Sequence, residues 1–202
     1  MATSETEICN LALSHLGIAK EIANLETENS AEANAMRRFY VTARDETLRE
    51  FAWPFATKQV ALGLVEEDPT DEWGFSYRYP SDAVALRRIL SGIRNDNRQS
   101  RAAYRITRDD DGLLVYTDIE DAELEYTMRE TDVLRFPSDF VMALSFLLAW
   151  LTAPRLAGGD PFKLAQRALQ LYEVELSKAR AMAAGEEQPE EPPASEFERM
   201  RE

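Results

Sequence analysis

Side chains that could carry reaction chemistry are scarce in this chain of 202 residues. There is one histidine, His15, and one cysteine, Cys9, so neither a zinc cluster of cysteines and histidines nor a disulfide within the chain can form. Both lie in a helical pattern, which predicts a buried Cys9 and a structural or capping His15. No GxGxxG, P-loop or G-x-S-x-G motif occurs. We therefore expect no catalytic residue, no metal site, no cofactor and no enzyme activity.

Carboxylates, by contrast, are abundant, with 37 acidic residues. The run from Asp109 to Gly112 resembles half of a calcium loop, but its first ligand position is Thr107 and its last is Asp118 instead of a bidentate glutamate. A plain hairpin turn is the prediction for this run. Paired carboxylates for glycoside hydrolysis are also available, although so acidic a chain always offers some pair at a suitable spacing.

A basic stretch stands out against the formal net charge of −14. Residues 87–108 contain seven arginines and a single acidic residue, Asp96. We predict a projecting hairpin that binds an acidic partner or senses DNA phosphates through Arg94, Arg98 and Arg101. Such polarity also favours self-association or head-to-tail docking. The alternative is a solvated loop kept soluble by its charge.

Four helices are predicted around a central region of strands. Ser4 with Glu7 forms a capping box for a helix over about residues 5–16, which Gly17 ends. Asn29 with Glu32 repeats the capping signal for a helix over about residues 30–51, which ends before Pro54. Ser138 is the predicted N-cap of a helix ended by Pro154 and residues 158–159. Asp160 and Pro161 begin the last helix, which stops near Gly185. The uncharged apolar run over residues 140–153 is shorter than the ~20 residues of a membrane span, so we expect a core helix and no membrane.

Between these helices the apolar period changes from 3.6 to 2, which indicates strands. We predict one antiparallel sheet from alternating stretches that include Leu124–Met128 and a hairpin joined at residues 109–112. The fold class is thus α+β, mainly α. Its predicted parts are N-terminal bundle helices (1–55), an inserted antiparallel β region (56–132), C-terminal bundle helices (133–185) and an acidic tail (186–202).

The tail holds seven glutamates and three prolines with almost no apolar residue, a composition that predicts disorder in the free protein. It is expected to become ordered against a partner, with Phe197 and Met200 as apolar anchors and Arg199 and Arg201 as charge contacts. The strongly acidic remainder of the chain disfavours nonspecific binding to the nucleic-acid backbone.

The sequence resembles the head-to-tail adaptor proteins of short-tailed bacteriophages, a family also described as tail tubular protein A or head–tail connector. The shared phrases follow one another in order along nearly the whole chain: Ile8 to Leu13 with Leu16-Gly17, Tyr40 to Asp45, Trp53 to Ala56, Trp73 with Tyr77 to Asp82, Phe136 to Phe140, and Ser195 with Arg199. Pro54 departs from the family's usual Trp-Asn-Phe-Ala.

The resemblance implies a helical bundle with an inserted β region and a structural role in the virion. Twelve copies would form a ring between the portal protein and the tail nozzle protein, with a channel that passes and retains double-stranded DNA without specific binding, and with C-terminal tails on the portal. The chain would occupy the host cytoplasm before assembly. Two alternatives are a tail-associated glycosidase acting on cell wall or capsule, and a free regulatory or chaperone-like helical protein.

Overall fold

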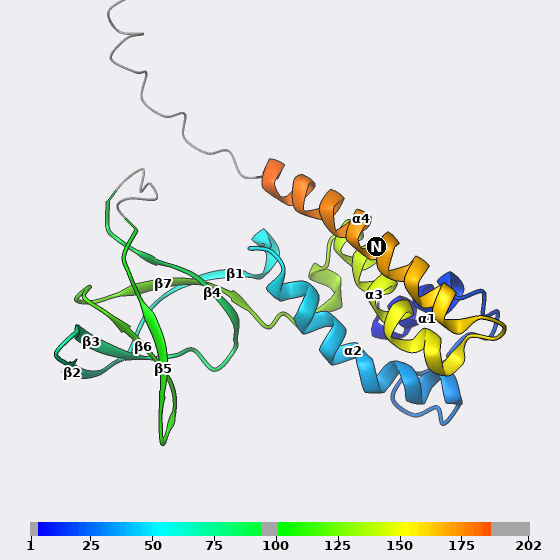
Figure 1. The fold of residues 1–202 in the computed structure, drawn as a ribbon, viewed down its shortest axis with the longest axis horizontal. Helices are drawn as coiled ribbons and strands as arrows, with labels where there is room; N and C mark the ends of the chain where they lie inside the picture. The colour runs from blue at the N-terminus through cyan, green and yellow to red at the C-terminus, as the bar shows by residue number, and fades with distance from the viewer. Residues whose placement is uncertain (1–3, 94–100, 187–202) are drawn as a thin grey trace, which may run out of the picture. The chain divides into compact units, whose positions relative to one another are not determined.

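The computed structural model describes residues 4–93 and 101–186 and shows an α+β protein (Figure 1). In the described residues, two α-helices and a short 3-10 helix precede seven consecutive strands, and a second 3-10 helix and two α-helices follow them. The helices are α1 (Glu5–His15), α2 (Ala31–Arg49), η1 (Pro54–Ala56), η2 (Val133–Arg135), α3 (Ser138–Leu156) and α4 (Pro161–Glu186). The strands are β1 (Thr57–Ala61), β2 (Leu64–Thr70), β3 (Trp73–Arg78), β4 (Ala83–Leu90), β5 (Arg105–Asp109), β6 (Gly112–Thr117) and β7 (Glu123–Met128).

The chain divides into two compact units. The helical unit comprises Met1–Lys58, Asp82–Ala85 and Thr127–Ala184, and the strand unit comprises Gln59–Ser81, Leu86–Tyr126 and Gly185–Glu202, within the residues that the structure describes. Each unit is therefore assembled from segments that are distant in sequence. Three of the boundaries fall inside β1, β4 and β7, one falls between β3 and β4, and one falls near the end of α4.

Helix starts follow local capping chemistry. The predicted cap of α1 is confirmed, because the Glu7 N–H donates to Ser4 Oγ at 3.2 Å. The predicted cap of α2 is wrong by one residue: Ser30, not Asn29, has the extended backbone of an N-cap, and its Oγ accepts from the Ala33 N–H at 3.2 Å. A hydroxyl three residues before a free N–H is enough to begin the helix, so neighbouring polar residues compete for this role.

The ends of α3 also differ from prediction. Pro137 is its N-cap and Ser138 its first residue, because the Pro137 carbonyl already accepts from the Val141 N–H. Pro154 does not end the helix, which continues to Leu156. A proline in the last turn removes only one N–H, and the Ala157 N–H still bonds to the Ala153 carbonyl at 3.0 Å. The predicted start of α4 is confirmed by the Lys163 N–H, which donates to Asp160 Oδ1.

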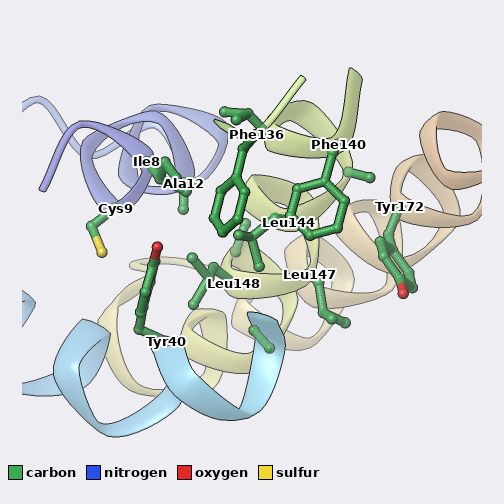
Figure 2. Close-up of a cluster of buried hydrophobic side chains, with 14 of the residues drawn as sticks. Ile8, Cys9, Ala12, Tyr40, Phe136, Phe140, Leu144, Leu147, Leu148 and Tyr172 are labelled. Carbon is green, nitrogen blue, oxygen red and sulfur yellow. The ribbon is translucent and has the colours of Figure 1, made fainter. Parts of the chain in front are cut away.

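The core of the helical unit is built around α3 (Figure 2). Apolar residues from every α-helix of this unit meet there, and Phe140, Leu144, Leu147 and Leu148 of α3 are fully buried. By length and composition alone α3 is apolar enough to cross a membrane. Ten of its residues are buried against the other helices, however, which is the pattern of a core helix. The prediction that residues 140–153 form such a helix is confirmed.

An aromatic cluster closes one side of this core. The Phe140 ring lies 5.2 Å from Trp53, 5.0 Å from Phe55 and 4.9 Å from Phe136 between ring centroids. Trp53 is buried, and its Nε1–H donates to the Thr47 carbonyl at 2.9 Å near the end of α2. Pro54 begins η1, so the turn after α2 is a short 3-10 helix. This turn places the side chains of Trp53 and Phe55 against Phe140 of α3.

The prediction of a single antiparallel sheet is wrong, because the strands form two sheets. One has the order β1-β7-β4 and the other the order β2-β3-β6-β5. Alternation of apolar residues identifies strands, but it does not choose their neighbours, which depend on long-range packing. The predicted hairpin at residues 109–112 is confirmed, with Asp109 opposite Gly112 at the end of the β5–β6 ladder.

The strand unit has its own buried side chains. Tyr77, Val115 and Leu124 are almost completely inaccessible. The Tyr77 hydroxyl donates to the Ile119 carbonyl at 2.9 Å and accepts from the Ala122 N–H at 3.4 Å. These two bonds connect β3 to the segment between β6 and β7 and satisfy a buried polar group.

Candidate interaction surfaces and buried polar sites

His15, the last residue of α1, is a structural residue as predicted. Its ring stacks on Phe146 of α3 with a centroid distance of 3.8 Å and an interplanar angle of 12°. Its Nε2 lies 3.0 Å from Ser145 Oγ, and Ser145 itself donates to the Met142 carbonyl at 2.7 Å. Because the serine has one proton to donate, Nε2–H is the donor toward Ser145.

This geometry does not suit a serine–histidine catalytic pair. Ser145 is fully buried, and its proton is directed to a backbone carbonyl instead of to the imidazole. Burial also lowers the pKa of His15 below its ordinary value, which favours the neutral ring that donates to Ser145. The contact joins α1 to α3, and no sequence signal could have indicated it because the two residues lie 130 positions apart.

One cleft lies beside this contact, and a second lies along the start of α4. The smaller has a volume of about 390 Å³ and is lined by His15, Phe146, Leu164, Arg167 and Leu171, among others. The larger, about 690 Å³, follows the first turns of α4 and includes Asp160, Lys163 and Arg167. Among the residues that the structure describes, Asp160 is the one carboxylate in either lining, and its Oδ1 caps α4. The described part of each lining therefore lacks the two facing carboxylates that glycoside hydrolysis needs.

A second polar site surrounds Asp45 on α2. Arg44, which is only 5% exposed, donates from Nε and Nη2 to Asp45 Oδ1 at 3.0 and 2.9 Å. The other carboxylate oxygen accepts from Arg129 Nε at 2.9 Å, and the Arg129 N–H donates to the Asp82 carbonyl at 2.7 Å. Asp45 therefore neutralises a buried guanidinium and also connects α2 to the segment that follows β7.

Burial shifts the pKa of three groups on α1 and α2. Burial raises the pKa of the Cys9 thiol to about 12, and the carboxylate of Glu5 adds to this shift. Burial also raises the pKa of Glu5, while the positive charge of Arg44 opposes the increase. Figure 2 shows the Tyr40 hydroxyl pointing toward Cys9, and burial raises the pKa of that phenol too. A thiol that stays protonated is a small apolar group in the core and not a nucleophile, as predicted for Cys9.

The acidic turn at residues 109–112 is a structural turn. Asp109 Oδ1 accepts from the Asp111 and Gly112 N–H groups at 3.0 and 2.7 Å. Both carboxylate oxygens also accept from Arg78, at 2.9 and 3.0 Å. These bonds hold the pKa of Asp109 below its ordinary value. Among the described residues, no group of three or more His, Cys, Asp or Glu side chains is arranged to hold a metal ion.

The structure separates the arginines of the basic stretch into different environments. Arg88 pairs with Glu125 at 3.0 Å, and Arg105 lies 3.8 Å from Glu72 with both side chains largely exposed. Arg101 precedes β5 and is exposed. Arg94 and Arg98, the other two predicted contacts of the hairpin, lie outside the described residues. Among the described arginines of this stretch, the pairing of Arg88 with Glu125 reduces the positive charge that Arg88 offers to a partner.

The predicted tail contacts, Phe197, Arg199, Met200 and Arg201, also lie outside the described residues, as does nearly all of the segment predicted to be disordered. The helix α4 ends at Glu186, one residue beyond the predicted stop. A scan against models of protein families and a search of curated proteins find no match to this chain.

Proposed function

We propose that this chain is a head-to-tail adaptor of a short-tailed bacteriophage, a structural virion protein that forms a ring between the portal and the tail nozzle. The observation that carries the proposal is the position of the family-like phrases in the fold. Ile8 and Ala12 come from the first phrase, and Tyr40, Trp53 and Phe140 come from three others; all five are buried in one cluster. The resemblance therefore concerns the residues that specify the core of the helical unit.

The burial of these phrases in one core supports extending the proposal from the phrases to the fold. A helical bundle with an inserted β region is the architecture that the adaptor family implies, and four helices with strands between α2 and α3 are consistent with it. Two polar contacts within the helical unit are structural: His15 joins α1 to α3, and Asp45 joins α2 to Arg129. A protein built in this way works through its shape and its surfaces.

Charge supports a role in passing DNA. With a net charge of −14, the averaged field of each copy repels a polyanion, and twelve copies around a channel would increase the effect. Double-stranded DNA could then move through the ring without being held by nonspecific phosphate contacts. In this proposal the acidic tail, with its anchors at residues 197–201, binds the portal subunits above the ring.

The tail provides the direct test. A chain that ends at Glu186 keeps every residue of the helical core, so its melting temperature should match that of the full chain. Incubated with purified portal rings of the same virus, the full chain should decorate them, and electron microscopy should show added density around the portal. The truncated chain should not decorate them.

A matched pair of full-length variants separates the anchors from the charge of the tail. Phe197→Ala with Met200→Ala should weaken decoration, because it removes the two sizeable apolar side chains of the tail. Exchange of the exposed Met182 of α4 for alanine removes an apolar side chain outside the tail and should leave decoration unchanged. Failure of the full chain to bind portal rings would overturn the proposal, and unchanged decoration by the truncated chain would move the portal contact away from the tail.

A further inference from the structure

The two outer strands of the four-stranded sheet are its least covered parts. Among the described strands, β2 pairs only with β3 and β5 pairs only with β6 (Figure 1). Every residue of β2 except Pro69 is exposed, and so are three of the five residues of β5. An exposed edge offers unpaired backbone groups to another strand, so proteins normally block or use it.

An apolar row crosses the whole sheet and emerges at both edges. The registers place Leu64 opposite Tyr77, Tyr77 opposite Val115, and Val115 opposite Ile106. Paired residues share a face, so these four side chains form one row. Its two inner members are 2% and 0% exposed, but Leu64 and Ile106 at the ends are 51% and 47% exposed. Each edge therefore presents one half-covered aliphatic side chain.

The neighbouring row ends in opposite charges. Glu66 lies opposite Ser76, Ser76 opposite Tyr116, and Tyr116 opposite Arg105. This row has an acid at the β2 edge and a base at the β5 edge. The side chain of Arg105 is 66% exposed, and its contact with Glu72 at 3.8 Å leaves it open to a second partner.

Charges beyond these rows reinforce the same polarity. Glu67 and Asp68 follow Glu66 along β2, and the exposed Arg101 precedes β5. Along β5 the order is Arg105 and then Ile106, whereas along β2 it is Leu64 and then Glu66. Leu64 and Glu66 occupy neighbouring rows because the register of β2 shifts between them. An antiparallel β5 can therefore place Ile106 opposite Leu64 and Arg105 opposite Glu66 in one alignment.

From this complementarity we infer that copies of the chain bind one another edge to edge, with β5 of one copy adding to β2 of the next. Successive strands of the sheet are antiparallel, so a repeated copy brings β5 and β2 together in antiparallel orientation. Ile106 of one copy then lies beside Leu64 of the next, and Arg105 lies beside Glu66. Backbone bonds supply the attraction, and the two side-chain pairs fix the register.

The geometry of β2 limits the length of this interface. The register of β2 shifts on both sides of Glu66–Glu67, Asp68 has a backbone φ of 49°, and Pro69 has no N–H to donate. Only the first part of β2 can accept a strand, so each contact is weak until copies are held close together. Different edges of each copy meet in this contact, so it is heterologous, the kind that closes into rings. Closure into a ring around DNA rests on the proposed function, whereas the edge contact itself does not.

Cysteine cross-linking tests the alignment in the full chain. Within one copy Leu64 and Ile106 are three strand spacings apart, roughly 14 Å, so cysteines at these positions cannot form a disulfide inside one chain, for which the Cα atoms must lie within about 7 Å. Under mild oxidation at high concentration, Leu64→Cys with Ile106→Cys should give a ladder of multimers on a non-reducing gel. Leu64→Cys with Leu113→Cys, whose second site is exposed but lies on the inner strand β6, should give no ladder.

Charge exchange tests the same contact without a cross-link. Arg105→Glu and Glu66→Lys should each weaken association by roughly tenfold at low salt, measured by sedimentation equilibrium. An equimolar mixture should recover association, because the new glutamate of one variant meets the new lysine of the other. Arg108→Glu makes the same charge change in the same strand, outside the short overlap, and should leave association unchanged.

The possible outcomes separate this inference from the proposed function. A ladder with recovery in the mixture supports the edge contact, and this result stands even if portal rings are not decorated. Absence of the ladder, or equal effects of Arg105→Glu and Arg108→Glu, overturns the edge contact even if the chain decorates portal rings. Cross-links that join Ile106→Cys to itself, and not to Leu64→Cys, would mean that β5 pairs with β5 in a symmetric dimer and would also overturn it.

Discussion

Removal of the Phe140 ring is the most direct test of how the helical unit is held together. This side chain is fully buried in the aromatic cluster, where it contacts Trp53, Phe55 and Phe136. A buried phenylalanine covers about 200 Å² of surface, and at ~25 cal/mol per Å² this corresponds to ~5 kcal/mol. Alanine keeps part of this burial, so we expect Phe140→Ala to lower the free energy of unfolding by about 4 kcal/mol.

Urea unfolding at 25 °C measures this loss, with circular dichroism at 222 nm reporting the helices. The matched control is Phe162→Ala, which removes the same ring from a position that is 75% exposed on α4. It should cost less than about 0.5 kcal/mol. If Phe140→Ala does not fold, Phe140→Leu gives a smaller loss of about 1 to 1.5 kcal/mol that can still be measured.

Similar losses for Phe140→Ala and Phe162→Ala would refute the reasoning, because burial is the property that distinguishes the two sites. A loss below about 1.5 kcal/mol for Phe140→Ala would mean that the surrounding rings collapse into the space. The cluster would then be plastic, and the position of α3 against η1 would depend on other contacts.

Three further predictions concern the buried polar groups of the helical unit. Asp45→Ala should destabilise the fold by about 3 kcal/mol or more, because it leaves Arg44 buried without its carboxylate. Arg129→Ala should cost less than about 1 kcal/mol, because the Arg129 side chain is 46% exposed. Equal losses of stability in urea unfolding would contradict this prediction. The single histidine should titrate below pH 6.5 in an NMR experiment on the folded chain, since burial lowers its pKa. Its contribution to stability should be complete above the pKa of the unfolded chain and should decrease as the pH falls toward the lower pKa of the folded chain. A pKa at or above 6.5 would exclude the buried stacked geometry. Cys9 should not react with a thiol reagent at pH 8 until the protein is unfolded, because its pKa is raised to about 12, and rapid labelling of the native protein would show that α1 opens.

Local patterns in the sequence predict the secondary structure well. The capping residues Ser4 and Asp160 act as expected, and the hairpin at residues 109–112 follows from its turn residues. These features depend on bonds between residues three or four positions apart, so the chemistry is visible in the sequence. Where two neighbours compete for one role, as Asn29 and Ser30 do, the local pattern leaves an uncertainty of one residue that the fold resolves.

Contacts between distant segments are not available from such patterns. His15 reaches Ser145 across 130 positions, and Asp45 reaches Arg129 across 84, with no spacing rule that relates either pair. The basic stretch was visible in the sequence, but the pairing of Arg88 with Glu125 was not. Net charge along a sequence counts side chains, whereas binding depends on which of them remain open after folding.

The sequence by itself determined the four α-helices of the described residues, the presence of antiparallel strands between α2 and α3, and the apolar character of α3, because each depends on the periodicity of neighbouring residues. It did not indicate the two 3-10 helices. Only the tertiary structure decided that the strands form two sheets and that β2 and β5 lie at the edges of one of them. Strand order is chosen by packing between segments far apart in the chain. That order places Leu64 and Ile106 at the two ends of one row and Glu66 and Arg105 at the two ends of the next, and so creates a surface that no local pattern contains.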